Sequence, residues 1–233
     1  MNLILLFDDD FTGERTVRLH GRRLEHVTSV HRAAVGDSLV VGVAGGRIGR
    51  GRVTRLEREA LEMDVALDAE PPPALPLTLL LALPRPKVLN RVIAGAVSLG
   101  VKRIHLLNAW RVEKSYWKSP RMAEENLRQQ SILGLEQARD TILPTIEVHR
   151  LFRPFVEAFA PEGLAIVAHP GAAEVCPRGV TEHVTLAIGP EGGFIAREVD
   201  SLVSAGFTPV SLGPRILRVE TAVPALIARI LQE

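Results

Sequence analysis

The sequence predicts an α/β protein, in which a C-terminal region built on a parallel β-sheet follows a small β-rich module. Four prolines in the six residues from Pro71 to Pro76 interrupt regular structure. Before them, short alternating segments are separated by glycines, as in small β-barrels. After them, continuous apolar runs alternate with helical periodicity, which indicates a parallel sheet covered on both faces.

Length and composition limit the classes of protein that remain possible. The chain has 233 residues, of which 46% are hydrophobic and 24% charged, so it can bury a core and is not a disordered chain. Its single cysteine, Cys176, has no partner within the chain, so we expect a structural thiol and a cytoplasmic location. No apolar run approaches the roughly 20 residues that span a bilayer, so we expect no membrane partner.

Residues 1–70 form the first predicted domain. The alternation typical of half-buried strands recurs in three segments, 37–43, 51–56 and 62–67. Charge is uneven here, because residues 11–58 contain ten arginines and only four acidic residues. The formal net charge of +1 for the whole chain conceals this local excess.

Residues 71–76 are predicted to be a stiff linker, and residues 77–233 the second domain. Apolar runs predict strands at 77–83, 103–107, 145–149, 164–168, 184–188 and 208–212. Helical spacing predicts helices at 87–99, 120–138, 152–159, 195–205 and 222–231. The regular alternation is that of a parallel sheet with crossover helices.

Three of these strands end in loops rich in glycine and proline. The loops are His169-Pro170-Gly171, Gly189-Pro190-Glu191-Gly192-Gly193 and Gly213-Pro214-Arg215-Ile216-Leu217-Arg218. Ligands bind at the carboxyl ends of parallel strands, and glycine lets a ligand approach the backbone closely. We therefore predict a ligand site here, with three ordinary strand-to-helix turns as the alternative. The usual phosphate-binding motifs are missing, which favours an uncharged or zwitterionic ligand such as an adenosine derivative.

The motifs in two of these loops resemble those of a known family. Ile188-Gly189-Pro190-Glu191-Gly192-Gly193-Phe194 and Leu212-Gly213-Pro214-Arg215-Ile216-Leu217-Arg218-Val219-Glu220-Thr221-Ala222 are similar to the two signatures of the RsmE family. These are SPOUT-class methyltransferases that methylate N3 of a uridine in 16S rRNA. The resemblance covers nearly the whole chain. It implies a SPOUT domain with a C-terminal trefoil knot, an N-terminal PUA-like RNA-binding β-barrel domain, and a homodimer.

The resemblance also implies S-adenosylmethionine (AdoMet) as cofactor and 16S rRNA within the 30S subunit as partner. The residues that it assigns to cofactor binding are His169, Pro170, Ile188, Gly189, Glu191, Gly192, Gly193, Leu212, Gly213, Ile216 and Leu217. Because AdoMet supplies its own electrophile, the reaction requires no metal, and we expect neither a metal site nor a metal partner.

Catalysis requires that uridine N3 lose its proton before it can attack a methyl group. A fixed positive charge beside the developing oxyanion would favour the anion, and Arg218 is our candidate for it. Glu220 would orient that arginine or accept the proton, and Thr221 would cap the last helix. The alternative for Arg218 and Glu220 is a structural ion pair at the helix start.

Arginines of the first domain are predicted to contact RNA phosphates, with Arg22, Arg23 and Arg32 as the chosen candidates. The full set also includes Arg15, Arg18, Arg47, Arg50, Arg52 and Arg55, and its alternative is a solvated exterior. The chain departs from the family's pattern at Leu6, Ser98 and Asp140, which we expect to face the substrate RNA or its cleft and not the cofactor. These departures leave open a different target RNA, and a non-catalytic RNA-binding assembly protein is a further alternative.

Overall fold

The computed structural model describes residues 2–231, and contacts divide the chain into two compact units. The N-terminal unit contains the residues up to Pro73 together with Ile132–Leu143, and the C-terminal unit contains Ala74–Ser131 and the residues from 144 onward. The chain therefore passes between the units within the proline-rich segment, again within helix α3 (Glu124–Ala138), and a third time after Leu143. The boundaries expected from sequence, 1–70, 71–76 and 77–233, stay a prediction.

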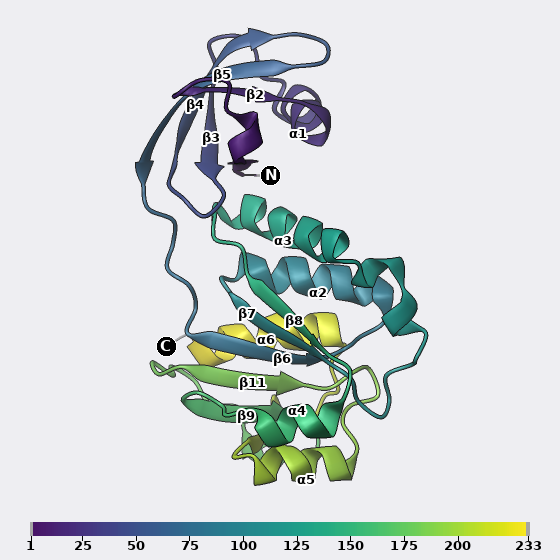
Figure 1. Ribbon diagram of the computed structural model, residues 1–233. Coiled ribbons are helices and arrows are strands. Elements are labelled where there is room, and N and C mark those ends of the chain that lie inside the picture. Colours follow the sequence, from purple (N-terminus) through teal and green to yellow (C-terminus); the bar gives the residue numbers. More distant parts are fainter. Residues whose placement is uncertain (1, 232–233) are drawn as a thin grey trace. The chain divides into compact units, whose positions relative to one another are not determined.

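The N-terminal unit is built on a five-stranded sheet with the order β1-β3-β4-β5-β2 (Figure 1). Strand β1 pairs parallel with β3, and the other pairs are antiparallel. Because β1 and β2 are the two outer strands, the sheet is a curled, open half-barrel, and the closed barrel expected from sequence is not confirmed. The strands are β1 (Ile4–Leu6), β2 (Thr16–Leu19), β3 (Ser38–Val43), β4 (Ile48–Leu56) and β5 (Leu61–Ala69).

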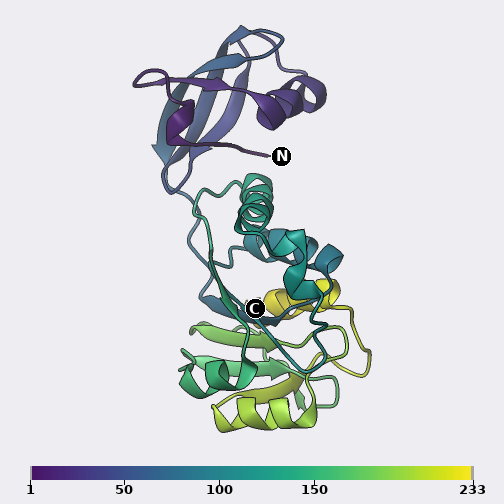
Figure 2. The same cartoon turned by 45° about the vertical axis from the view of Figure 1, so that its right-hand side comes forward.

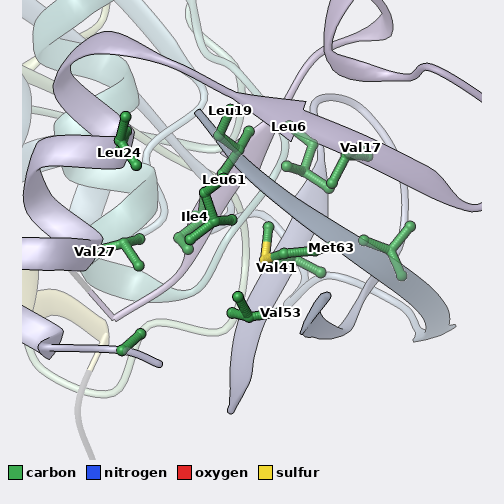
Figure 3. Packing of buried hydrophobic residues seen from close by; sticks show 12 residues of the cluster. Ile4, Leu6, Val17, Leu19, Leu24, Val27, Val41, Val53, Leu61 and Met63 are labelled. Atoms are coloured by element: carbon green, nitrogen blue, oxygen red, sulfur yellow. The ribbon is translucent and has the colours of Figure 1, made fainter. Parts of the chain in front are cut away.

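One apolar cluster forms the core of this unit (Figure 3). Strand residues such as Leu6, Val41 and Met63 are fully buried in it. Leu24 and Val27 join them from a helix that the sequence did not predict, α1 (Gly21–His26), and from the π-helical turn η2 (Val27–His31) that continues it. So short a segment, with few apolar positions, carries too little periodicity to be recognised as a helix.

An ion pair between Arg23 and Asp10 connects α1 to the 3-10 turn η1 (Asp8–Asp10), which follows β1. The Arg23 guanidinium donates to the two carboxylate oxygens of Asp10 at 2.5 and 2.6 Å and to the Leu5 carbonyl at 2.8 Å. Asp10 Oδ2 also accepts the backbone N–H of Phe7 at 2.8 Å. Asp10 is buried, so these bonds compensate the cost of removing its charge from water.

The second half of α3 and the residues after it complete the same unit. Arg22 donates to both carboxylate oxygens of Glu136 at 2.9 and 3.1 Å, and Glu136 is only 1% exposed. The Glu136 carbonyl accepts the backbone N–H of Leu3 at 3.0 Å. Farther on, the Thr141 hydroxyl donates to the Gly46 carbonyl at 2.5 Å. A segment remote in sequence therefore neutralises one of the N-terminal arginines.

The C-terminal unit confirms the predicted α/β class with a parallel sheet. Its seven strands run in the order β10-β12-β9-β11-β6-β7-β8, and every pair is parallel. All six residues of β6 and all five of β11 are buried, which requires cover on both faces. The strands are β6 (Leu77–Ala82), β7 (Arg103–Leu107), β8 (Thr145–His149), β9 (Leu164–Ala168), β10 (Glu174–Val175), β11 (Val184–Ile188) and β12 (Thr208–Ser211).

Two pairs of helices cover the two faces of this sheet (Figures 1 and 2). Helices α2 (Pro86–Ser98) and α6 (Val219–Leu231) pack together on one face, and α4 (Phe152–Ala158) and α5 (Ala196–Ser204) on the other. Among the described helices, none is both long enough and apolar enough to cross a membrane.

Two helices differ from their predicted extent. The stretch expected to be continuous from residue 120 contains the 3-10 turn η4 (Pro120–Met122) and an extended Ala123 before α3 begins, and the 3-10 turn η3 (Tyr116–Lys118) precedes it. Helix α6 begins at Val219, because the Arg218 carbonyl accepts the N–H groups of Thr221 and Ala222 at 2.9 and 2.7 Å. Thr221 therefore lies inside the first turn, and its predicted role as the cap is wrong.

The ion pair between Arg23 and Asp10 yields a prediction on stability. Arg23→Gln should lower the free energy of unfolding by about 2–3 kcal/mol, because it leaves a buried carboxylate without its charged partner. The matched control is Arg50→Gln on the exposed side of β4, which should change that free energy by less than about 0.5 kcal/mol. Urea-induced unfolding measures both variants, and equal values would contradict the assignment.

Candidate functional site

A pocket lies where β9, β11 and β12 end, at the carboxyl edge of the parallel sheet. Its walls come from the three loops after these strands and from Val219, Ala222 and Leu226 of α6. The residues that sequence assigned to a cofactor meet here with one exception: His169, Pro170, Ile188, Gly189, Glu191, Gly193, Leu212, Gly213, Ile216 and Leu217 all line the pocket. The structure thus brings together residues that lie up to 48 positions apart, from 169 to 217.

The exception is Gly192, which faces Arg111 instead. A Cβ at Gly192 would lie 2.7 Å from Arg111 Cδ, and the Gly192 carbonyl accepts a hydrogen bond from the Arg111 guanidinium. Gly192 therefore packs against Arg111, on the side of the loop away from the pocket lining, and does not line the pocket.

Tight backbone geometry forms the loop after β11. The Gly193 N–H donates to the Pro190 carbonyl at 2.7 Å, and Gly193 has a φ of +72°, a conformation that favours glycine. A Cβ at Gly189 would lie 2.8 Å from the Phe194 backbone nitrogen, so the returning chain leaves no room for a side chain. The loop therefore presents glycine backbone to the pocket at both of these positions.

Loops after two neighbouring strands hold this loop in place. Glu191 Oε1 accepts the backbone N–H of Arg85, just after β6, at 2.9 Å. Buried Glu198 of α5 accepts the N–H of Ile195 at 2.9 Å with one oxygen and that of Trp110, after β7, at 2.7 Å with the other. The loops after β6, β7 and β11 are thus joined through two carboxylates.

Hydrogen bonds also connect the remaining pocket loops. The His169 N–H donates to the Val210 carbonyl at 2.9 Å, and the Cys176 N–H to the Ser211 carbonyl at 2.8 Å. Burial raises the pKa of the Cys176 thiol, although Arg229 nearby opposes the shift. The thiol therefore stays protonated and lacks the thiolate character of a nucleophile, which agrees with the structural role expected for it.

A second hollow, of about 750 Å³, adjoins the first and shares Glu191 with it. Five of its lining residues are cationic and only two are acidic. We call it the cationic hollow, and its charged residues are Arg85, Lys87, Arg91, Arg121, Arg218, Glu191 and Glu220. A surface of this sign attracts a polyanion.

Both residues predicted to be catalytic line the cationic hollow. Arg218 is exposed immediately before α6, and Glu220 lies in the first turn with its side chain 21% exposed. The Glu220 carboxylate faces Arg91 at 3.9 Å, so the ion pair within the hollow joins Glu220 to a different helix and not to Arg218.

Tyr116 is a neutral hydrogen-bonding group in the cationic hollow. Its hydroxyl donates to Glu113 Oε1 at 3.0 Å. Burial and this hydrogen bond raise the pKa of Tyr116, and Arg85 partly opposes them. The phenol therefore remains protonated at neutral pH.

Sequence reasoning missed most of the cationic hollow. Arg85 and Lys87 lie a few residues after β6, at its junction with α2. The carboxyl end of a parallel strand must lie at the same edge as the three loops, so the sequence did contain a signal for these two residues. Tyr116 and Arg121 belong to the 3-10 turns η3 and η4 between β7 and α3, and only the fold brings these turns to the residues that follow β6.

Most of the arginines predicted to contact RNA have partners inside the N-terminal unit. Arg22 and Arg23 are paired with Glu136 and Asp10. Further partners are Val65 for Arg15, Glu62 for Arg18, Glu70 for Arg47 and Glu57 for Arg55. Arg32, Arg50 and Arg52 are exposed, and within residues 2–231 no acidic group lies within 4 Å of their guanidinium groups.

The positions that depart from the family's pattern do not all face solvent. Leu6 is 0% exposed in the core, and Asp140 is 1% exposed and accepts the Ile142 N–H at 2.9 Å. The expectation that these two positions face RNA is therefore wrong. Ser98 is half-buried, and its hydroxyl donates to the Gly95 carbonyl.

Comparisons with known proteins agree with this architecture. The model of a family described as RNA methyltransferase domain matches residues 70–231. Ribosomal RNA small subunit methyltransferase E of Synechocystis sp. is 29% identical over 224 residues, which cover 93% of this chain and 73% of that protein. The protein of the same name from Treponema pallidum is 28% identical over 241 residues, covering 99% and 91%.

The fold has a close counterpart among solved structures. The crystal structure of a ribosomal RNA small subunit methyltransferase E from Neisseria gonorrhoeae bound to S-adenosyl methionine matches with a TM-score of 0.77. The match covers 98% of this chain and 95% of that one at 24% identity, so it bears on the fold.

The buried carboxylate of Glu198 yields a second prediction. Glu198→Gln should lower the free energy of unfolding by about 1–3 kcal/mol, because the amide can no longer accept both backbone N–H groups. Amide hydrogen exchange at Trp110 and Ile195 should quicken in the variant. Glu157→Gln, on the exposed surface of α4, is the control that should change neither quantity. Unchanged exchange at both amides in Glu198→Gln would disprove the connection.

Proposed function

We propose that this chain, which belongs to the RNA methyltransferase family as an RsmE-type member, is specific for N3 of a uridine in 16S rRNA. The methyl group would come from AdoMet. One observation carries the proposal. Ten residues from three strand ends and the loops after them line a single pocket, and a cationic hollow that Arg218 lines shares Glu191 with that pocket. A methyl donor and an anionic polymer would therefore meet at one place.

The pocket suits AdoMet through its chemistry. Apolar side chains of Ile188, Leu212 and Leu226 offer contacts to a flat adenine ring, while the glycine backbone offers hydrogen bonds without charge. A Cβ at Gly189 would close the loop against Phe194, so the cradle depends on glycine. When bound there, AdoMet supplies an electrophilic methyl group.

The cationic hollow suits the RNA substrate. Uridine N3 must lose a proton before it attacks, and the negative charge then spreads onto the neighbouring oxygens. In our proposal, Arg218 stabilises that charge. Its guanidinium is exposed just before α6, and the nearby carboxylate of Glu220 pairs with Arg91 and not with Arg218. Arg85, Lys87 and Arg121 hold the phosphates on either side. Glu220 pairs with Arg91, and in our proposal it accepts the proton from N3 or orients the neighbouring arginine.

The N-terminal unit would extend the RNA-binding surface. We propose that its open half-barrel is a PUA-like module and that Arg32, Arg50 and Arg52 contact phosphates. Arg22 and Arg23 would first have to leave buried carboxylates, which costs several kcal/mol per ion. The resemblance to RsmE further supports a trefoil knot in the C-terminal unit and a homodimer, both of which stay proposals.

Nucleoside mass spectrometry tests the reaction and its target together. Small subunits from a strain that lacks the gene should lack the N3-methyl group at one uridine of 16S rRNA that is methylated in the parent strain. The purified protein with AdoMet should restore that methyl group. A methyl group that appears instead on another RNA would contradict the target but keep the chemistry. No transfer to any cellular RNA, despite AdoMet binding, would favour the assembly-protein alternative.

The separate roles proposed for the cofactor pocket and the cationic hollow yield a further prediction. Arg218→Ala should lower single-turnover methyl transfer by about 100-fold or more and leave AdoMet affinity within twofold, because it removes charge stabilisation only. Gly189→Ala should instead weaken AdoMet binding, as measured by calorimetry, because the added methyl group clashes with the Phe194 backbone. If Arg218→Ala weakened AdoMet binding as much as it slowed transfer, the catalytic role of Arg218 would be rejected.

A further inference from the structure

A cluster of three possible metal ligands lies at the edge of the C-terminal sheet, and the proposed reaction does not use it. His105 belongs to β7, and Glu147 and His149 belong to the outer strand β8. None of the three lines the cofactor pocket or the cationic hollow. In the sheet order, β8 and the pocket strands β9 and β12 are on opposite sides of β6 and β11.

The strand register brings these side chains together. In the parallel pairing of β7 with β8, His105 is opposite Glu147 and Leu107 is opposite His149. Side chains two residues apart on a strand point to the same side, so Glu147 and His149 share a face with His105. A site built on paired strands is positioned more precisely than one built on loops.

The distances between the ligand atoms match those around a tetrahedral ion. His105 Nδ1 lies 3.0 Å from His149 Nε2, and Glu147 Oε2 lies 3.8 Å and 3.6 Å from these two nitrogens. Ligand atoms that bind zinc at roughly 2.0–2.1 Å in a tetrahedron are about 3.3–3.4 Å apart. The three atoms therefore already outline one face of such a tetrahedron.

Aromatic contacts fix the two imidazole rings. The His149 ring lies 4.1 Å from the Phe155 ring, and the His105 ring lies 5.6 Å from Phe155 and 5.4 Å from Phe159. Burial lowers the pKa of both histidines, and Glu147 opposes the shift in each case. The aromatic contacts therefore fix where each imidazole can offer a ring nitrogen to a metal ion.

Solvent can reach the cluster from one side. An open hollow of about 850 Å³ is lined by all three residues and by Phe155 and Phe159, and the Glu147 side chain is 55% exposed. A water molecule can therefore complete a fourth position. Two imidazoles and one carboxylate suit Zn²⁺ better than Mg²⁺ or Ca²⁺, which prefer oxygen ligands only.

A hydrogen bond between two neutral imidazoles is the simpler explanation of the contact between His105 and His149. It does not account for Glu147, whose carboxylate is just beyond hydrogen-bonding distance of both rings, at 3.6 and 3.8 Å. A cation placed among the three atoms accounts for all three separations and balances the carboxylate charge.

We propose that His105, Glu147 and His149 bind one Zn²⁺ ion, with water as the fourth ligand, and that this ion joins the edge strand β8 to β7. The ion would stabilise the sheet edge, because a ligand that binds the folded state raises its stability. The proposal is independent of methyl transfer, and its test does not need activity.

Zinc binding to the full-length protein provides the test. The protein is treated with a chelator, titrated with Zn²⁺ by calorimetry, and dialysed before metal analysis. We expect one zinc per chain and a higher Tm in its presence. His149→Gln and Glu147→Gln should each weaken binding at least tenfold and abolish the rise in Tm. Glu157→Gln, an equal charge change on neighbouring α4, should bind zinc as the unaltered chain does.

Two outcomes would overturn the proposal. One is the absence of bound zinc after dialysis together with an unchanged Tm. The other is wild-type affinity in both His149→Gln and Glu147→Gln, which would show that zinc binds elsewhere. Far-ultraviolet circular dichroism checks that the variants fold, and if His149→Gln does not, Glu147→Gln at its exposed position decides the question.

Discussion

The common direction of the strands in the C-terminal sheet is the constraint on which the functional site depends. Because β6, β9, β11 and β12 run parallel, the loops that follow them all emerge at one edge. Strand β11 lies at the centre, fully buried, and its pairing with β6 and β9 fixes where its loop begins. Glu191 and Glu198 then join that loop to its neighbours through backbone N–H groups, so hydrogen bonds within the protein hold these loops together.

Positive charge is distributed differently from what the composition of the N-terminal region indicates. Ten arginines against four acidic residues in 11–58 indicated a phosphate-binding surface. In the folded unit, many of these guanidinium groups pair with acidic side chains, including Glu136, which is more than a hundred residues away from Arg22. The cationic hollow beside the cofactor pocket instead combines Arg85, Arg121 and other residues that are scattered in the sequence.

Local patterns predicted what local interactions decide. The strands at 103–107, 145–149, 164–168 and 184–188 have the predicted bounds, because each is a short segment with apolar residues at strand spacing. Helix α1 was missed because it is held by the Arg23–Asp10 pair and by core contacts, which outweigh its weak periodicity. The start of α6 was misplaced because the helical hydrogen bonds already begin at the Arg218 carbonyl, a backbone group that the side-chain pattern does not mark.

The sequence by itself determined the α/β class, the order of strands and helices in the C-terminal region, and the loops that carry the pocket, since these depend on periodicity and on glycine and proline at short range. Only the tertiary structure decided which charges remain available, that Gly192 turns away toward Arg111, and that His105 meets Glu147 and His149. The physical reason is that pairing between charges and register between strands are set by contacts across tens of residues, which no local pattern encodes.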